Sequence, residues 1–222
     1  MLIHHFLETS ATRLPDKTAL IFGDQRLTYR EINELANQLA HALIASGISR
    51  GDRVAIFMDN SIECVISIFG VLKAGGIFST LSPTLKEKKL QYILAHLEAS
   101  FLITHATRLP LVTEAAESVS SLRTVLVCGE TKSRFPIGTT PPYVAWQDFV
   151  AGHPAHNPAC RCIDIDLANI IYTSGSTADP KGIMMTHLTM STAATSIITY
   201  LENTEDDIII NVLPLSFDYG LY

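Results

Sequence analysis

The most informative segment of the chain reads Ile170-Ile171-Tyr172-Thr173-Ser174-Gly175-Ser176-Thr177-Ala178-Asp179-Pro180-Lys181-Gly182. It begins with an apolar run that is typical of a buried strand. Glycines then allow the backbone to turn its N–H groups toward an anion, hydroxyl groups donate further hydrogen bonds, and a lysine adds positive charge. The segment therefore predicts a strand that leads into a phosphate-binding loop. The alternative is a plain surface loop, in which the same residue types are common.

Two common phosphate-binding patterns do not account for this segment. The Walker form G-x-x-x-x-G-K-[ST] fails because Pro180 precedes Lys181 and Gly182 follows it. The dinucleotide fingerprint G-x-G-x-x-G is absent from the chain. A different class of phosphate-binding motif is therefore required.

The segment resembles the signature loop of the adenylate-forming enzymes, which include acyl-CoA synthetases, luciferases and peptide-synthetase adenylation domains. The family pattern is Tyr-Thr-Ser-Gly-Ser/Thr-Thr-Gly-x-Pro-Lys-Gly, and the chain departs from it only at Ala178. The resemblance implies that the loop holds the β- and γ-phosphates of ATP, with Mg²⁺, while a carboxylate attacks the α-phosphorus. It assigns nucleotide binding to Thr173, Ser174, Gly175, Ser176, Thr177, Lys181 and Gly182.

Two further segments resemble motifs of the same family. Residues 72–83 are similar to its structural L-K-A-G-G-x-x-x-P-L-x-P motif, and residues 213–220 are similar to the segment that lines its acid pocket. The resemblance assigns substrate binding to Phe217 and Asp218. In amino-acid-activating relatives, the aspartate of an F-D-x-S motif pairs with the substrate's amino group, but Gly220 stands here in place of the serine. Two interpretations of Asp218 stay open, a partner for a substrate ammonium and a cap of the adjoining segment.

Ala178 predicts a rate effect. If the family glycine has a positive φ, alanine costs on the order of 1 kcal/mol there and shifts the loop. Otherwise the position tolerates a small residue and nothing changes. We expect slower adenylation rather than none, so Ala178→Gly should raise the rate of ATP–pyrophosphate exchange. Equal rates in the two proteins would remove Ala178 from consideration.

The composition of the chain indicates a globular protein and argues against some kinds of partner. Of 222 residues, 47% are hydrophobic and 17% are charged, which is typical of a globular protein. The net charge of −6 argues against a nucleic-acid partner. The longest apolar stretch, residues 65–72, is far shorter than the roughly 20 residues that a membrane span needs. Without a signal peptide at the N-terminus, the four cysteines are expected to be reduced thiols of a cytoplasmic protein.

Strand and helix patterns alternate along the chain, which predicts an α/β fold with layered sheets of mainly parallel strands flanked by helices. A hairpin is expected at residues 18–28. Further strands are expected at 53–58, 77–81, 101–104, 124–127, 168–172, 183–186 and 208–212. Capping boxes are expected at Thr28 with Glu31 and at Thr84 with Glu87, and either Asn60 or Ser61 is expected to cap a helix that ends at residues 75–76.

Several histidines and cysteines are candidate metal ligands. The candidates in the linker are His153, His156, Cys160 and Cys162. Their spacing does not match a zinc site, so no metal ligand is assigned. His4 and His5 are expected at the surface or rim of a packing helix. His187 follows the loop and is expected either to approach the nucleotide or to pack near the start of a helix.

The resemblance covers the whole chain and implies that residues 1–222 are the N-terminal part of an AMP-binding (adenylation) domain. The remainder of that domain and a small C-terminal domain, which carries the family's catalytic lysine, would then be absent, so no catalytic residue is assigned. The implied reaction couples a small carboxylic or amino acid to ATP and releases pyrophosphate. The acyl group then passes to coenzyme A or to the phosphopantetheine of a carrier protein. The alternative is an inactive, truncated remnant that binds only a nucleotide or a partner.

Overall fold

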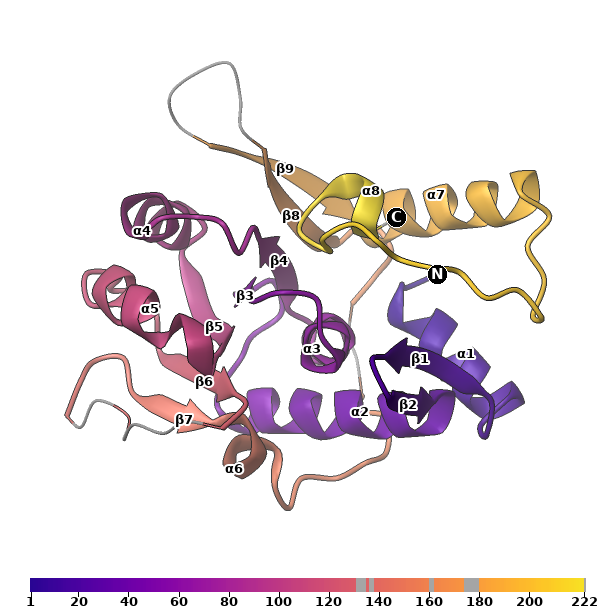
Figure 1. The fold of residues 1–222 in the computed structure, drawn as a ribbon, viewed down its shortest axis with the longest axis horizontal. Helices are drawn as coiled ribbons and strands as arrows, with labels where there is room; N and C mark the ends of the chain where they lie inside the picture. Colours follow the sequence, from indigo (N-terminus) through magenta and orange to yellow (C-terminus); the bar gives the residue numbers. More distant parts are fainter. Residues whose placement is uncertain (131–134, 136–137, 160–161, 174–179, 222) are drawn as a thin grey trace.

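The structure is a computed structural model that describes residues 1–130, 135, 138–159, 162–173 and 180–221, and these residues form a layered α/β fold (Figure 1). The helices are α1 (His4–Arg13), α2 (Tyr29–Ala45), α3 (Ile62–Lys73), α4 (Glu87–His96), a 3₁₀ turn η1 (Ala106–Arg108), α5 (Leu109–Ala116), α6 (Trp146–Val150), α7 (His187–Tyr200) and α8 (Asp218–Leu221). The strands are β1 (Thr18–Phe22), β2 (Gln25–Thr28), β3 (Arg53–Phe57), β4 (Ile77–Leu81), β5 (Ala99–His105), β6 (Thr124–Cys128), β7 (Tyr143–Ala145), β8 (Leu167–Thr173) and β9 (Lys181–Thr186).

A seven-stranded sheet lies at the centre, with the strand order β7-β6-β5-β3-β4-β8-β9. Neighbouring strands are parallel throughout, except that β8 and β9 form an antiparallel hairpin. β1 and β2 pair with each other as a separate hairpin. The predicted fold class, a mainly parallel sheet flanked by helices, is therefore confirmed.

Helices cover both faces of the sheet, with α2 and α3 on one face and α4 and α5 on the other (Figure 1). In β3, Val54 and Ile56 belong to the apolar cluster that contains α2 and α3, whereas Ala55 and Phe57 belong to the cluster that contains α4 and α5. Successive side chains of a strand point to opposite faces. Because both faces are buried, the strand is an uninterrupted apolar run rather than an alternating one.

Local sequence signals set the boundaries of α2 and α3. The predicted capping box at the start of α2 is confirmed, since the Glu31 N–H donates to Thr28 Oγ1 at 3.2 Å and the Thr28 N–H donates to Glu31 Oε2 at 2.7 Å. The backbone N–H and the hydroxyl of Thr28 both donate to the Glu31 carboxylate, and these two hydrogen bonds hold the pKa of Glu31 below its ordinary value. Of the two residues expected to cap α3, Ser61 does so, accepting from the Cys64 N–H at 3.1 Å. α3 ends before Gly75, which has a φ of +83°.

The capping box predicted at Thr84 is wrong. α4 begins at Glu87 with Lys86 at the N-cap position, and no side chain caps it. Thr84 precedes this position by two residues, and its hydroxyl lies 2.8 Å from Ser82 Oγ. The side chain is therefore bonded within the preceding turn and not to the helix.

The strand predicted at residues 208–212 is also wrong, because these residues have no strand pairing. Their apolar side chains are exposed, with Ile208 at 88% and Ile210 at 83%. The preceding turn instead contacts the N-terminal part of the chain, since Glu205 forms an ion pair with Arg13 at 3.2 Å. An apolar, β-branched run becomes a strand only where a neighbouring strand can pair with it, and within the described part of the chain this run has none.

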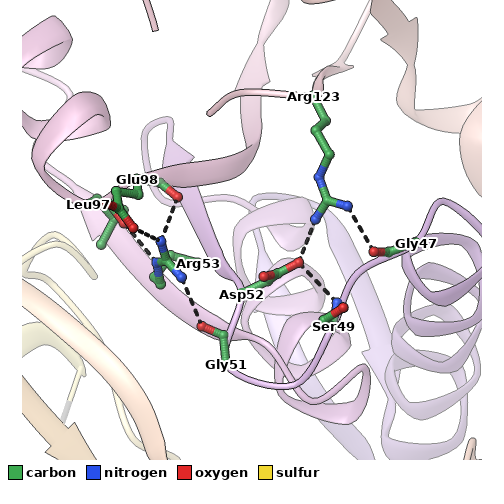
Figure 2. A network of polar contacts seen from close by, with 8 residues as sticks. All are labelled: Gly47, Ser49, Gly51, Asp52, Arg53, Leu97, Glu98 and Arg123. Carbon is green, nitrogen blue, oxygen red and sulfur yellow. Dashed lines mark hydrogen bonds and ion pairs between the residues drawn. The ribbon is translucent and has the colours of Figure 1, made fainter. Parts of the chain in front are cut away.

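Ion pairs join the amino ends of β3, β5 and β6 to the adjoining turns (Figure 2). Arg53, the first residue of β3, donates to Glu98 Oε2 at 2.7 Å just before β5. Arg123, just before β6, binds Asp52 and donates to the Gly47 carbonyl at 2.8 Å. Structural contacts thus join the amino-terminal ends of these strands to the neighbouring turns. Folds of this kind bind ligands at the opposite side of the sheet, where the carboxyl-terminal ends of the parallel strands lie.

α1 is more deeply buried than the sequence predicts. His4, expected at the surface or rim, is only 1% exposed, because α1 packs against α2 and α3 and the His4 ring contacts His187 edge-on at 5.9 Å between centroids. Glu8 accepts from Lys73 Nζ at 2.6 Å, and Lys73 Nζ also donates to Asn157 Oδ1 at 3.1 Å. The Lys73 side chain is fully buried. Its ammonium therefore joins α1 and α3 to the linker at residues 151–166.

Candidate functional site

The predicted phosphate loop connects β8 to β9. The register of the hairpin pairs Thr173 with Lys181 and Tyr172 with Gly182, so the two ends of the loop are held side by side. β8 is joined to the body of the sheet by its pairing with β4 and by a hydrogen bond of 2.6 Å from Ser79 Oγ to the Ile170 carbonyl. A parallel strand of the main sheet therefore carries the loop at its carboxyl end.

The structure brings together three of the residues assigned to nucleotide binding. Thr173 is half-buried at the end of β8, and the side chain of Lys181 is exposed directly opposite it. Gly182 follows in β9. The other four predicted loop residues lie outside the described residues, namely Ser174, Gly175, Ser176 and Thr177. Ala178 also lies outside them.

Gly182 is required by packing. A Cβ atom at this position would lie 2.9 Å from Ile170 Cγ2 and 3.4 Å from Tyr172 Cζ. The absence of a side chain lets the side chains of Ile170 and Tyr172 lie against the backbone of β9. These contacts fix the base of the loop.

We therefore expect Gly182→Ala to destabilise the protein by about 1–3 kcal/mol, because the added methyl group would overlap with Ile170. Chemical denaturation measures the loss. The control is Met184→Ala in the same strand, where the side chain is 67% exposed and little change is expected. Equal stabilities of Gly182→Ala and the native protein would contradict this account.

The sequence analysis missed two residues of α4, of which His96 contacts the base of the loop and Tyr92 stacks on His96. His96 Nδ1 lies 2.7 Å from the Tyr172 hydroxyl, and the Tyr92 ring stacks on His96 at 5.6 Å between centroids. Burial raises the pKa of Tyr172 to about 12, so its phenol stays protonated at neutral pH. Because 76 residues separate His96 from Tyr172, no local pattern could have indicated the pair.

The segment assigned to the acid pocket lies at the same edge of the sheet. Asn60, after β3, donates to the Leu213 carbonyl at 2.9 Å and accepts from the Leu215 N–H at 2.9 Å. Thr80 of β4 donates to the Leu215 carbonyl at 2.9 Å. Asn60 does not cap α3 but instead holds this segment, a role that the sequence analysis missed.

The two predicted substrate-binding residues follow directly. Phe217 is 56% exposed. Asp218 begins α8, but its side chain lies outside the described residues. The phosphate loop follows β8, and the predicted acid segment is bound to the ends of β3 and β4, the latter being the neighbour of β8. The two predicted sites therefore belong to one edge of one sheet.

Of the two interpretations of His187, the structure favours packing. The side chain is fully buried, and its Nδ1 accepts from the Ile3 N–H at 3.2 Å. The backbone N–H of His187 donates to the Asp166 carbonyl at 3.0 Å at the start of α7. His187 thus joins the N-terminus of the chain to α7.

His4, His5 and Glu8 approach one another closely enough to suggest a metal site. Their ligand atoms lie within 4.8 Å of one another. However, the carboxylate of Glu8 is bonded to the buried ammonium of Lys73, which would repel a second cation there. The structure therefore gives no support for assigning a metal to this group.

The linker histidines and cysteines considered as metal ligands were His153, His156, Cys160 and Cys162. Cys160 lies outside the described residues. The linker binds α2 through its backbone, since Asn37 Nδ2 donates to the Ala155 carbonyl at 2.7 Å and His41 Nε2 lies 3.0 Å from the His156 carbonyl. Its described contacts are those of a structural connection.

Comparison with known proteins identifies the family of the chain. The sequence model described as "AMP-binding enzyme" matches residues 7–222. Bacitracin synthase 1 of Bacillus licheniformis is 33% identical over 220 residues, which make up 99% of this chain and 4% of that protein. Tyrocidine synthase 3 of Brevibacillus parabrevis is 35% identical over 188 residues, covering 83% of this chain and 2% of that protein. The chain thus spans a small fraction of the length of these relatives.

A solved structure shares the fold over the full chain. The apo structure of MbtA from Mycobacterium smegmatis superimposes with a TM-score of 0.89 and 28% identity, covering 100% of this chain and 40% of that one. No helix in the described ranges is long and apolar enough to cross a membrane. Because the family match extends over residues 7–222, the chain belongs to the AMP-binding enzyme family.

Proposed function

We propose that the protein containing this chain activates a small carboxylic or amino acid as an acyl-adenylate, with release of pyrophosphate, and then transfers the acyl group to a thiol. The observation that carries the proposal is the hairpin register, which sets Lys181 beside Thr173 at the base of the signature loop. The acid segment, held by Asn60 and Thr80 at the same edge, supports it. The family match, described as "AMP-binding enzyme", also supports it.

In this proposal the loop residues hold the β- and γ-phosphates of ATP. They are Thr173, Ser174, Gly175, Ser176, Thr177, Lys181 and Gly182. Lys181 supplies positive charge, and backbone N–H groups and hydroxyls supply hydrogen bonds, so the phosphates stay still while a carboxylate attacks the α-phosphorus. The hydroxyl oxygens of the loop suit Mg²⁺, which would spread the charge of the leaving pyrophosphate when bound. The acceptor thiol is coenzyme A or the phosphopantetheine of a carrier protein.

Residues 1–222 would form the N-terminal part of the adenylation domain, with the rest of that domain and the small C-terminal domain supplied by further polypeptide. This division is supported by the share of the solved MbtA chain that the match covers, which is 40%. We also place the protein in the cytoplasm. Cys64 and Cys128 are both buried free thiols, as a reducing compartment favours.

A second candidate function is an inactive remnant that binds only a nucleotide or a partner. The observation that favours it is the exposed apolar run at residues 208–213. Its exposed side chains are Ile208, Ile209, Ile210, Val212 and Leu213. Contiguous exposed apolar surface of this kind marks contact with further protein.

Acid-dependent ATP–pyrophosphate exchange by the full-length protein tests the proposal. The panel of substrates holds aliphatic acids, aryl acids and small amino acids. Exchange with an amino acid that is lost on Asp218→Ala would establish an amino-acid-activating ligase, because a substrate ammonium would lose its carboxylate partner. Exchange with a plain acid that survives Asp218→Ala would make Asp218 structural. No exchange with any acid would favour the remnant.

A further inference from the structure

We propose that His96 is a positioning residue for the phosphate loop and acts through its hydrogen bond to Tyr172. The inference rests on the proposed function, since the ligand of the loop is the ATP proposed above. His96 is the last residue of α4, and Tyr172 is the last residue but one of β8, directly before the loop. The contact therefore joins the body of the domain to the base of the loop.

His96 is held in place by its own helix. Leu90, Ile93 and Leu94 of α4 are each at most 1% exposed in the apolar cluster between this helix and the sheet. Tyr92, one turn before His96, stacks on the imidazole with an angle of 23° between the ring planes. The imidazole thus presents Nδ1 to Tyr172 from a rigid element, which is the arrangement that a positioning residue requires.

The hydrogen bond is available in either protonation state of His96. In a neutral imidazole that carries its proton on Nε2, the Tyr172 hydroxyl donates to Nδ1. When His96 is charged, Nδ1–H donates to the phenol oxygen instead. The 2.7 Å separation fits both arrangements.

The contact controls the position of Lys181 through the hairpin. Tyr172 lies opposite Gly182, and the next pair along the hairpin is Thr173 with Lys181. The Tyr172 ring packs where a side chain of Gly182 would lie, at 3.4 Å from the position of its Cβ. A shift of Tyr172 would therefore move the backbone of β9 at Gly182 and, with it, the adjoining Lys181.

Three variants of the full-length protein test the inference, namely His96→Ala, Tyr172→Phe and the double substitution. Loss of the bond should raise hydrogen–deuterium exchange of the β9 amides and the KM for ATP, each by roughly three- to tenfold, with a smaller change in kcat. The double variant should show increases in amide exchange and in KM no larger than those of either single variant, since all three variants lack the same hydrogen bond. His96→Asn can still offer a polar atom near the position of Nδ1 and should restore part of the effect. His153→Ala, in the linker, is the control.

The other possible results of these experiments would contradict the proposed role of His96 or the proposed function. Unchanged β9 exchange in both single variants would overturn the inference. Faster exchange with an unchanged KM for ATP would make the contact merely structural and would also overturn it, as would additive effects in the double variant. If the native protein shows no ATP-dependent activity, the proposed function fails. The amide exchange then still decides whether His96 fixes the hairpin.

Discussion

Lys181→Ala is expected to reduce acid-dependent ATP–pyrophosphate exchange of the full-length protein by about 100-fold or more, because the variant lacks the positive charge that we propose binds the phosphates. The side chain lies exposed at the base of the loop, opposite Thr173. Since little packing is removed, the melting temperature should stay close to that of the native protein. The effect should therefore appear in catalysis and not in stability.

The matched control for this variant is Lys88→Ala, which removes an exposed lysine of α4. We expect its exchange activity to equal that of the native protein. A Lys181→Ala protein with native activity would show that the loop binds phosphate without this charge, and the assignment of Lys181 would be wrong.

Glu8→Ala is expected to lower the free energy of unfolding by about 3–5 kcal/mol, because it leaves the ammonium of Lys73 buried without its carboxylate partner. Lys73 Nζ lies 2.6 Å from Glu8 Oε1, and the lysine side chain is fully buried. Denaturant unfolding measures the loss. Glu8→Gln keeps an acceptor for Lys73 and should lose less stability.

The comparison for this pair is Glu205→Ala, which breaks the ion pair of Glu205 with Arg13. Both of those side chains are more than half exposed, at 55% and 64%. Exposed ion pairs contribute little to stability, so little change is expected. If the two substitutions had equal effects, the buried pair would be no more important to the fold than an exposed one.

The sequence allowed prediction of the elements that local patterns specify. The strand at residues 77–81 and the capping box of Thr28 with Glu31 agree with the structure residue by residue. Both faces of the sheet are covered, and runs buried on both faces carry an unbroken apolar signal that is easy to read. Residues 208–212 are also mostly apolar and β-branched, but they do not pair with a strand. The signal reports apolar character and β propensity, whereas a strand also needs a neighbour with which to pair.

In the candidate site, too, some residues could be proposed from the sequence and others could not. The predicted phosphate loop is one contiguous segment, so the sequence could propose its residues, although Ser174 to Thr177 lie outside the described residues. The contacts that support it join distant parts of the chain, as with His96 and Tyr172, or Asn60 and Leu215. Such pairs depend on how α4 and β8, or the ends of β3 and β4, are placed in three dimensions. Nothing in the neighbouring residues of either partner indicates them.

The strand order also bears on how the chain reaches its native state. β7 lies at one edge of the sheet, and β6, β5, β3 and β4 lie between it and β8. The connecting residues therefore cross the width of the sheet, and they do so along α2, where Asn37 binds the backbone of residue 155. Pairing between segments far apart in sequence slows folding, because a long loop must close first. The hairpin that carries the phosphate loop is thus expected to dock late, on a sheet that has already formed.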